Sequence, residues 1–85
     1  MESYNRKLHP SEEAILRFFA YRHLPPRLRE VSLPFSVMAT HIINSVPSSA
    51  ETTMALRKLL EAKDCAVRAA LEPLDPPRDP TILSH

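Results

Sequence analysis

The sequence predicts an all-α protein in which a short N-terminal helix packs on a kinked antiparallel two-helix hairpin, assembled as a homo-oligomer. Three observations lead to this fold class. The 85 residues contain no Gly, which disfavours the tight turns of β-hairpins. The nine Pro residues divide the chain into segments whose apolar residues recur every three to four positions, the period of a helix. With one Cys, no internal disulfide can stabilise so small a chain, so self-association is the expected source of further burial.

Three regions are expected along the chain: a polar leader over 1–10, a helical-hairpin domain over 11–72, and a Pro-rich flexible tail over 73–85. The tail has Pro at 73, 76, 77 and 80. Because Pro lacks the backbone N–H that helices and sheet ladders use, this segment is expected to be extended.

The first helix is expected to start at Ser11, an N-cap residue followed by Glu12 and Glu13 in the first turn. It should continue to about His23, where Leu24-Pro25-Pro26 ends it. Its apolar face follows the i, i+3, i+4 pattern and consists of Ile15, Phe18 and Phe19.

The second helix is expected to open at Pro26, because Pro is tolerated in a first turn. Its apolar seam has near-heptad spacing and consists of Leu28, Val31, Phe35, Met38, Ile42 and Val46. Pro34 interrupts the seam without changing its phase, so we expect one kinked helix, with a full break at Ser32-Leu33 as the alternative. A second stripe lies away from the seam and consists of Leu33, Val37, Thr40 and Asn44.

The third helix is expected over about 49–72, after a turn in which Ser48 and Glu51 fit a capping box. Its apolar residues cover roughly half of its circumference, so the helix needs at least two partners. This favours an oligomer over the alternative of a loosely built monomer. The opposite, charged arc contains two i,i+4 pairs and is expected to be solvated: Arg57 with Glu61, and Asp64 with Arg68.

The composition argues against several classes of function. The formal net charge of +1 disfavours a strongly basic DNA-binding domain and a polybasic membrane segment. Without Gly, the chain has neither a P-loop nor a dinucleotide-binding turn. No apolar run approaches the roughly 18 residues of a membrane span, and no secretory signal is recognisable. We therefore expect a cytoplasmic protein that contacts neither membrane nor DNA.

Catalytic and metal-binding patterns are also missing from the sequence. None of the four His residues has a metal-ligand spacing: His9, His23, His41 and His85. The Ser residues cluster where they cap helices, and no paired carboxylates stand out as a general acid and base. We expect no enzymatic activity, no metal and no cofactor.

Two places are candidates for binding an anion or a nucleotide. Lys63 lies inside the apolar arc of the third helix, where an ammonium group must reach solvent, pair with an acid or meet an anion at an interface. Tyr21 and Arg27 flank the junction of the first two helices, where stacking and phosphate-binding groups gather. The alternative for this corner is that Tyr21 covers the core and the arginines are solvated.

Two stretches resemble known phage proteins. The stretch 23–35, HLPPRLREVSLPF, looks like small proteins common in phages of actinobacteria. The stretch 51–69 resembles the helical-hairpin domain of phage anti-CBASS and anti-Thoeris sponge proteins, whose pattern is E-x-[ST]-x-A-L-x-K-L-x-E-A. The residues that fill this pattern are Glu51, Thr53, Ala55, Leu56, Lys58, Leu59, Glu61 and Ala62.

The resemblance implies a protein that is not an enzyme. Sponge proteins form compact homo-oligomers, often hexamers, that sequester cyclic di- or trinucleotide immune signals between protomers in the host bacterial cytoplasm. The motif assigns Thr53 and Lys58 to the ligand, and analogy with an aromatic residue on the first helix adds Tyr21. Arg57 stands where these proteins often have Thr before the motif Lys. The full expected ligand-binding set is Tyr21, Arg27, Thr53, Arg57, Lys58 and Lys63.

Two other functions remain open. The chain is alternatively a helical protein–protein interaction module that uses the Leu33–Val37 stripe and has no small-molecule ligand. A small nucleic-acid-binding regulator is a third possibility, which the net charge of +1 argues against.

Overall fold

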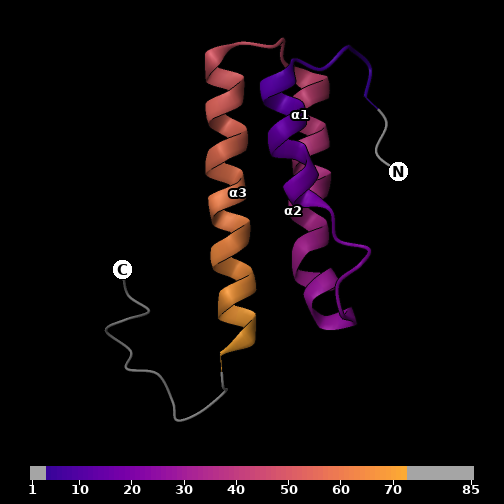
Figure 1. The fold of residues 1–85 in the computed structure, drawn as a ribbon, viewed down its shortest axis with the longest axis vertical. Coiled ribbons are helices and arrows are strands. Elements are labelled where there is room, and N and C mark those ends of the chain that lie inside the picture. Colours follow the sequence, from indigo (N-terminus) through magenta and orange to yellow (C-terminus); the bar gives the residue numbers. More distant parts are fainter. Residues whose placement is uncertain (1–3, 73–85) are drawn as a thin grey trace.

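The computed structural model describes residues 4–72, and all regular structure in that range is helical (Figure 1). The elements are α1 (Pro10–Leu16), the short 3-10 helix η1 (Arg17–Phe19), α2 (Pro26–Ser45) and α3 (Ala50–Leu71). The predicted all-α class is therefore confirmed. The Pro-rich tail expected over 73–85 lies outside the described residues.

The two long helices form the predicted hairpin. Helices α2 and α3 run antiparallel and side by side, joined by the turn at 46–49, and they share the most extensive contact in the molecule (Figure 1). Helix α1 packs on α3 near the closed end of the hairpin, and η1 packs on α1 and α2. The short N-terminal helix thus packs on α3, and η1, which follows it, packs on α2.

Helix α1 begins earlier and ends earlier than predicted. Its N-cap is His9, whose ring Nδ1 accepts a hydrogen bond from the Ser11 backbone N–H at 3.1 Å, and Pro10 takes the first helical position. The prediction that Ser11 is the N-cap is wrong. Its hydroxyl instead lies 3.1 Å from the Thr53 hydroxyl on α3. The helix also does not reach His23: η1 ends at Phe19 and the backbone of Ala20 is extended.

Helix α2 is continuous across Pro34, so the alternative of a full break at Ser32-Leu33 is wrong. Its buried line was also mispredicted. It consists of Ser32, Ser36, Ala39 and Ile43 and lies between the two predicted apolar stripes. Two members of the predicted seam, Met38 and Val46, are 48% and 42% exposed. Small side chains occupy the middle of this face because two elements, α3 and η1, approach it together.

The hydrophobic core is small and lies where all the elements meet. Its buried members are Ile15, Phe19, Ala39, Ile43 and Leu56. Residues from the N-terminal segment, Tyr4 and Leu8, are partly buried against it. The first residues that the structure describes therefore contribute to the core.

Helix α3 confirms the predicted third helix, but its cap is displaced by one residue. Ser49 is the N-cap, and its hydroxyl accepts from the Thr52 backbone N–H at 3.1 Å. Ser48, predicted as the cap, instead accepts from Arg6 Nη1 at 2.6 Å and donates to Glu12 Oε1 at 2.9 Å. The Ser48 hydroxyl is thus part of an interaction with the N-terminal segment.

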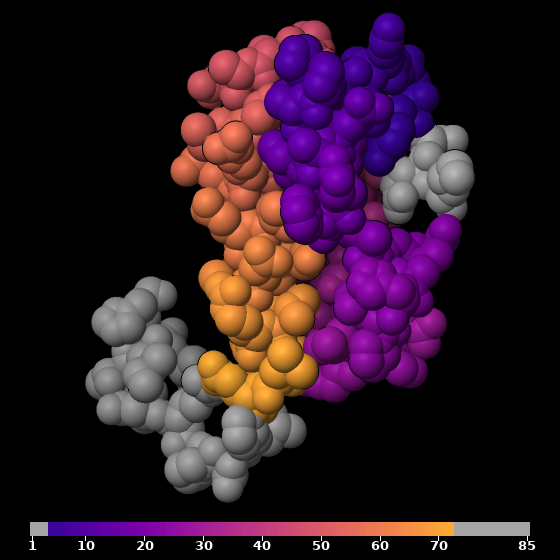
Figure 2. All heavy atoms as spheres, in the orientation of Figure 1, coloured from indigo at the N-terminus to yellow at the C-terminus, as the bar shows by residue number. Residues whose placement is uncertain are grey.

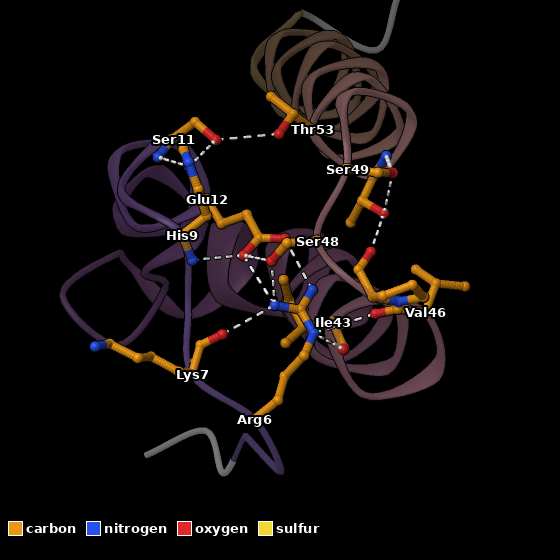
Figure 3. A network of polar contacts seen from close by, with 12 residues as sticks. Arg6, Lys7, His9, Ser11, Glu12, Ile43, Val46, Ser48, Ser49 and Thr53 are labelled. Atoms are coloured by element: carbon orange, nitrogen blue, oxygen red, sulfur yellow. Dashed lines mark hydrogen bonds and ion pairs between the residues drawn. The ribbon is translucent and has the colours of Figure 1, made fainter.

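An ion pair with a buried carboxylate ties that segment to the hairpin (Figure 3). Glu12, expected only as a first-turn acid, is fully buried, and both of its oxygens accept from the Arg6 guanidinium. Arg6 Nε also donates to the backbone carbonyls of Ile43 and Val46 at 3.0 and 3.1 Å. Its hydrogen bonds hold the pKa of Glu12 at about 2, together with those from the His9 backbone and Ser48.

Several large apolar side chains remain on the surface of this subunit. They include Phe18 on η1, Leu33, Val37 and Met38 on α2, and Met54 and Leu71 on α3. Among the helices of the described range, none has both the length and the hydropathy of a membrane span.

Candidate functional site

A groove of about 400 Å³ lies between the residues that follow α1 and the second half of α3. Figure 2 shows this side of the molecule, with the orange second half of α3 against violet residues that follow α1. The residues that line the groove are Arg17, Phe18, Ala20, His23, Leu24, Lys63, Asp64, Val67 and Arg68. We call it the cationic groove.

The charged lining comes from two parts of the chain. Arg17 lies on η1 and His23 in the connection to α2, whereas Lys63, Asp64 and Arg68 lie on α3. Positions 63, 64, 67 and 68 share one face of a helix, because residues three and four apart are neighbours there. The fold thus gathers three basic side chains, one imidazole and one carboxylate around a single hollow.

Lys63 is the most enclosed cation of the groove. Its side chain is 13% exposed, and its Nζ lies 3.4 Å from Asp64 Oδ1. Of the three alternatives that the sequence left for this ammonium, pairing with an acid is the one observed. The Asp64 side chain is 48% exposed, so the acid is the more solvent-accessible member of the pair.

Apolar and planar groups border these charges. Phe18 is 60% exposed on the η1 wall, and Leu24 and Val67 add apolar lining. The adjacent hollow, of about 260 Å³, shares Ala20 and His23 with the groove and contains Tyr21. There the Arg22 guanidinium lies 5.5 Å from the centre of the Tyr21 ring, a cation–π contact.

The structure brings Lys63 and Tyr21 of the predicted set to this region but separates them from Thr53. Thr53 lines a different hollow of about 260 Å³ near the start of α3, together with His9, Ser11 and Ser49. Ten residues of helix separate Thr53 from Lys63, a distance of about 15 Å along the axis of α3. Within one subunit, a single small ligand site therefore does not include both.

The other three predicted residues line neither the cationic groove nor the hollow beside it. Arg27, in the first turn of α2, is exposed. Arg57 and Lys58 are also exposed, and one helical residue step of about 100° separates them on α3. The structure does not gather these residues with Lys63, and their role in ligand binding stays a prediction.

Sequence reasoning missed three charged residues of the groove. Asp64 and Arg68 were expected to pair with each other on a solvated arc, but Asp64 pairs with Lys63 and Arg68 Nη2 lies 3.3 Å from Cys65 Sγ. No sequence pattern identified Arg17 as a site residue, because it lines the same groove as Lys63 only once the chain has folded. The spacing of positions 63, 64, 67 and 68 could have identified Asp64 and Arg68, because it places them on the same helix face as Lys63.

Within residues 4–72, no group of three or more His, Cys, Asp or Glu side chains is placed to hold a metal ion. Comparisons with protein-family models, curated proteins and solved structures found no match for this chain.

Proposed function

We propose that this chain is a phage-encoded sponge that binds cyclic di- or trinucleotides in the host bacterial cytoplasm and sequesters them without cleavage. The observation that carries the proposal is the cationic groove, where Arg17, Lys63 and Arg68 surround a hollow with apolar walls. The resemblance of 51–69 to the sponge hairpin pattern points to the same class of ligand.

The chemistry of the groove suits a ligand that combines phosphates with bases. Arg presents a planar fork of donors that matches phosphate oxygens, and Lys supplies a compact charge. Phe18 and Tyr21 offer exposed or partly exposed rings beside these cations, on which bases stack. A volume of about 400 Å³ lies within the usual range for small-molecule sites.

Hydrogen bonds to phosphate and stacking of bases are of the size that capture requires. A hydrogen bond to a charged group contributes about 1.5–3 kcal/mol, and stacking contributes about 1–3 kcal/mol per base. Micromolar binding requires about 8 kcal/mol. Contacts from the three groove cations and two stacked bases contribute about 6.5–15 kcal/mol, a range that spans this requirement. Sequestration needs no further chemistry.

We also propose that the chain works as a homo-oligomer, which the resemblance suggests is a hexamer. Val37 is 60% exposed and Leu33 is 41% exposed on the same side of α2. A second copy that covered this stripe would remove apolar surface from water. In that assembly, a neighbouring protomer would supply Thr53, Arg57 and Lys58 to the ligand.

We also propose that α2 is kinked at Pro34 within the assembly, because Pro has no backbone N–H to donate to the helix.

Native mass spectrometry with and without a panel of cyclic di- and trinucleotides tests both parts of the proposal. We expect an oligomer that gains a fixed number of ligands, and heat denaturation should release each ligand with its mass unchanged. Absence of binding across the panel would overturn the assignment, and release of linear products would overturn capture without cleavage.

The second candidate function is a protein–protein interaction module, which the exposed Leu33–Val37 stripe favours. Such a module would retain its partner when the groove is changed by Lys63→Met and would lose it on Val37→Glu. A sponge should show the first of these changes as a loss of nucleotide binding. Lys63→Met therefore separates the two functions.

A further inference from the structure

The cationic groove contains a carboxylate that a pure phosphate site does not need. Asp64 follows Lys63 on the α3 wall of the groove, and its side chain is 48% exposed. A carboxylate repels phosphate, because like charges raise the energy of a bound anion. The position of Asp64 is therefore better suited to a part of the ligand that carries hydrogen-bond donors.

The pair formed by Lys63 and Asp64 sets a cation and an anion side by side, 3.4 Å apart. Lys offers only donors and an ionised carboxylate offers only acceptors, with about four lone-pair sites on its two oxygens. One contact to Lys63 thus leaves Asp64 free to accept two more hydrogen bonds. The two adjacent side chains together offer one donor group and two acceptor sites.

The Watson–Crick edge of guanine is the complement of this set of groups. It presents the O6 acceptor, the N1–H donor and the N2–H₂ donor in order, whereas adenine presents one donor and one acceptor. We propose that Lys63 and Asp64 read a guanine base of the captured ligand, Lys63 at O6 and Asp64 at N1–H and N2–H₂. This inference rests on the proposed function, since it requires a nucleotide in the groove.

The rest of the groove is consistent with a base in this position. Phe18, 60% exposed, lies on the η1 wall of the same hollow and offers a ring for the base to stack on. Arg17 and Arg68 also line the groove and are available for phosphates. Asp64 contributes to base recognition alone, so its role can be varied separately from the phosphate contacts of Arg17 and Arg68.

Calorimetric titration of the full chain with cyclic di-GMP, cyclic di-IMP and cyclic di-AMP tests the inference. A bidentate base contact contributes enough discrimination that cyclic di-GMP should bind roughly tenfold tighter than cyclic di-AMP. Cyclic di-IMP, which lacks the N2 amine, should fall between them. Asp64→Asn should reduce the ratio between cyclic di-GMP and cyclic di-AMP to less than about threefold, because one acceptor is lost.

Glu61→Gln is the matched control, because it removes the same charge one turn earlier on α3 from an exposed position outside the groove. It should leave the ratio unchanged, and circular dichroism should show both variants folded. Equal binding of the three ligands by the wild type, or an unchanged ratio in Asp64→Asn, would overturn guanine reading while leaving capture intact. Failure of all three to bind would overturn guanine reading as well, and failure of the wider cyclic-nucleotide panel would overturn the proposed function.

Discussion

Arg6 and Glu12 form a bidentate ion pair in which Nη2 lies 2.8 Å from Oε2 and Nη1 lies 3.0 Å from Oε1. The carboxylate is fully buried, and the His9 backbone N–H and the Ser48 hydroxyl also donate to it. Because Arg6 Nε reaches the backbone at the end of α2, this pair joins three parts of the chain: the N-terminal segment, α1 and the hairpin turn (Figure 3).

The stability of the protein should therefore fall in acid. The Arg6 and backbone hydrogen bonds lower the pKa of Glu12 from 4.5 to about 2 in the folded state. A lowered folded-state pKa adds stability that is present above the unfolded pKa and is lost as the pH falls toward the folded value. We expect the urea midpoint to be level above about pH 5 and to drop between about pH 5 and pH 2.

Glu12→Gln should remove most of this acid dependence and lower the free energy of unfolding by about 2–3 kcal/mol at pH 7, because Arg6 loses its charged partner. Glu13→Gln, an exposed neighbour on α1, is the control and should change the free energy of unfolding by less than about 0.5 kcal/mol. Equal acid profiles for the wild type and Glu12→Gln would contradict this role of the ion pair.

Replacing Ser32, unlike replacing Glu12, should raise the free energy of unfolding. Its side chain is 1% exposed, and its Oγ has no hydrogen-bond partner within the described part of the chain. A buried hydroxyl without a partner costs about 1–3 kcal/mol, so Ser32→Ala should raise the free energy of unfolding by roughly 1 kcal/mol. Ser45→Ala, exposed at the end of α2, should have almost no effect in the same urea titration. A destabilised Ser32→Ala would show that the hydroxyl has a partner.

The proposed assembly predicts a change in sedimentation. Val37→Glu places a charge in the exposed stripe of α2, so a contact between copies should weaken and the sedimentation coefficient should fall toward that of one subunit. Ser45→Glu introduces the same side chain at an exposed position about 80° around α2 from Val37, away from the Leu33–Val37 stripe, and should keep the oligomer. A wild-type protein that sediments as a single subunit would contradict the assembly.

The helices were predictable from the sequence because their signals are local. The composition of 50–71 favours a helix, and Pro26 marks the start of α2, so both long helices were found within a few residues. The caps were less predictable. His9 and Ser49 cap because Ser11 and Ser48 have partners on other elements, and one helix alone does not reveal those partners.

Burial was harder to predict, because it depends on how many elements meet at a face. The seam of α2 was placed on its larger apolar residues, whereas α3 and η1 together bury the line of Ser32, Ser36 and Ala39 between them. Glu12 shows the same limit: its first-turn position indicates a solvated acid, and only the folded N-terminal segment brings Arg6 to it.

The sequence identified residues of the candidate site only where a side chain was unusual for its own segment of the chain. Lys63 stood out as a cation in an apolar arc, and Tyr21 as an aromatic at a corner rich in cations. Arg17 and Arg68 are ordinary surface residues in their helices. They join the groove because the chain folds back after α1 and brings η1 to the second half of α3.

The central claim is that the cationic groove captures a cyclic oligonucleotide, and the affinity of Lys63→Met for the tightest-binding member of the cyclic-nucleotide panel tests it most directly. Lys63 is the most enclosed cation of the groove, so its loss should weaken binding at least roughly tenfold in calorimetry. Lys7→Met removes an equal charge from an exposed position outside the groove and should change the affinity less than about twofold. Equal affinities for Lys63→Met and the wild type would contradict the account.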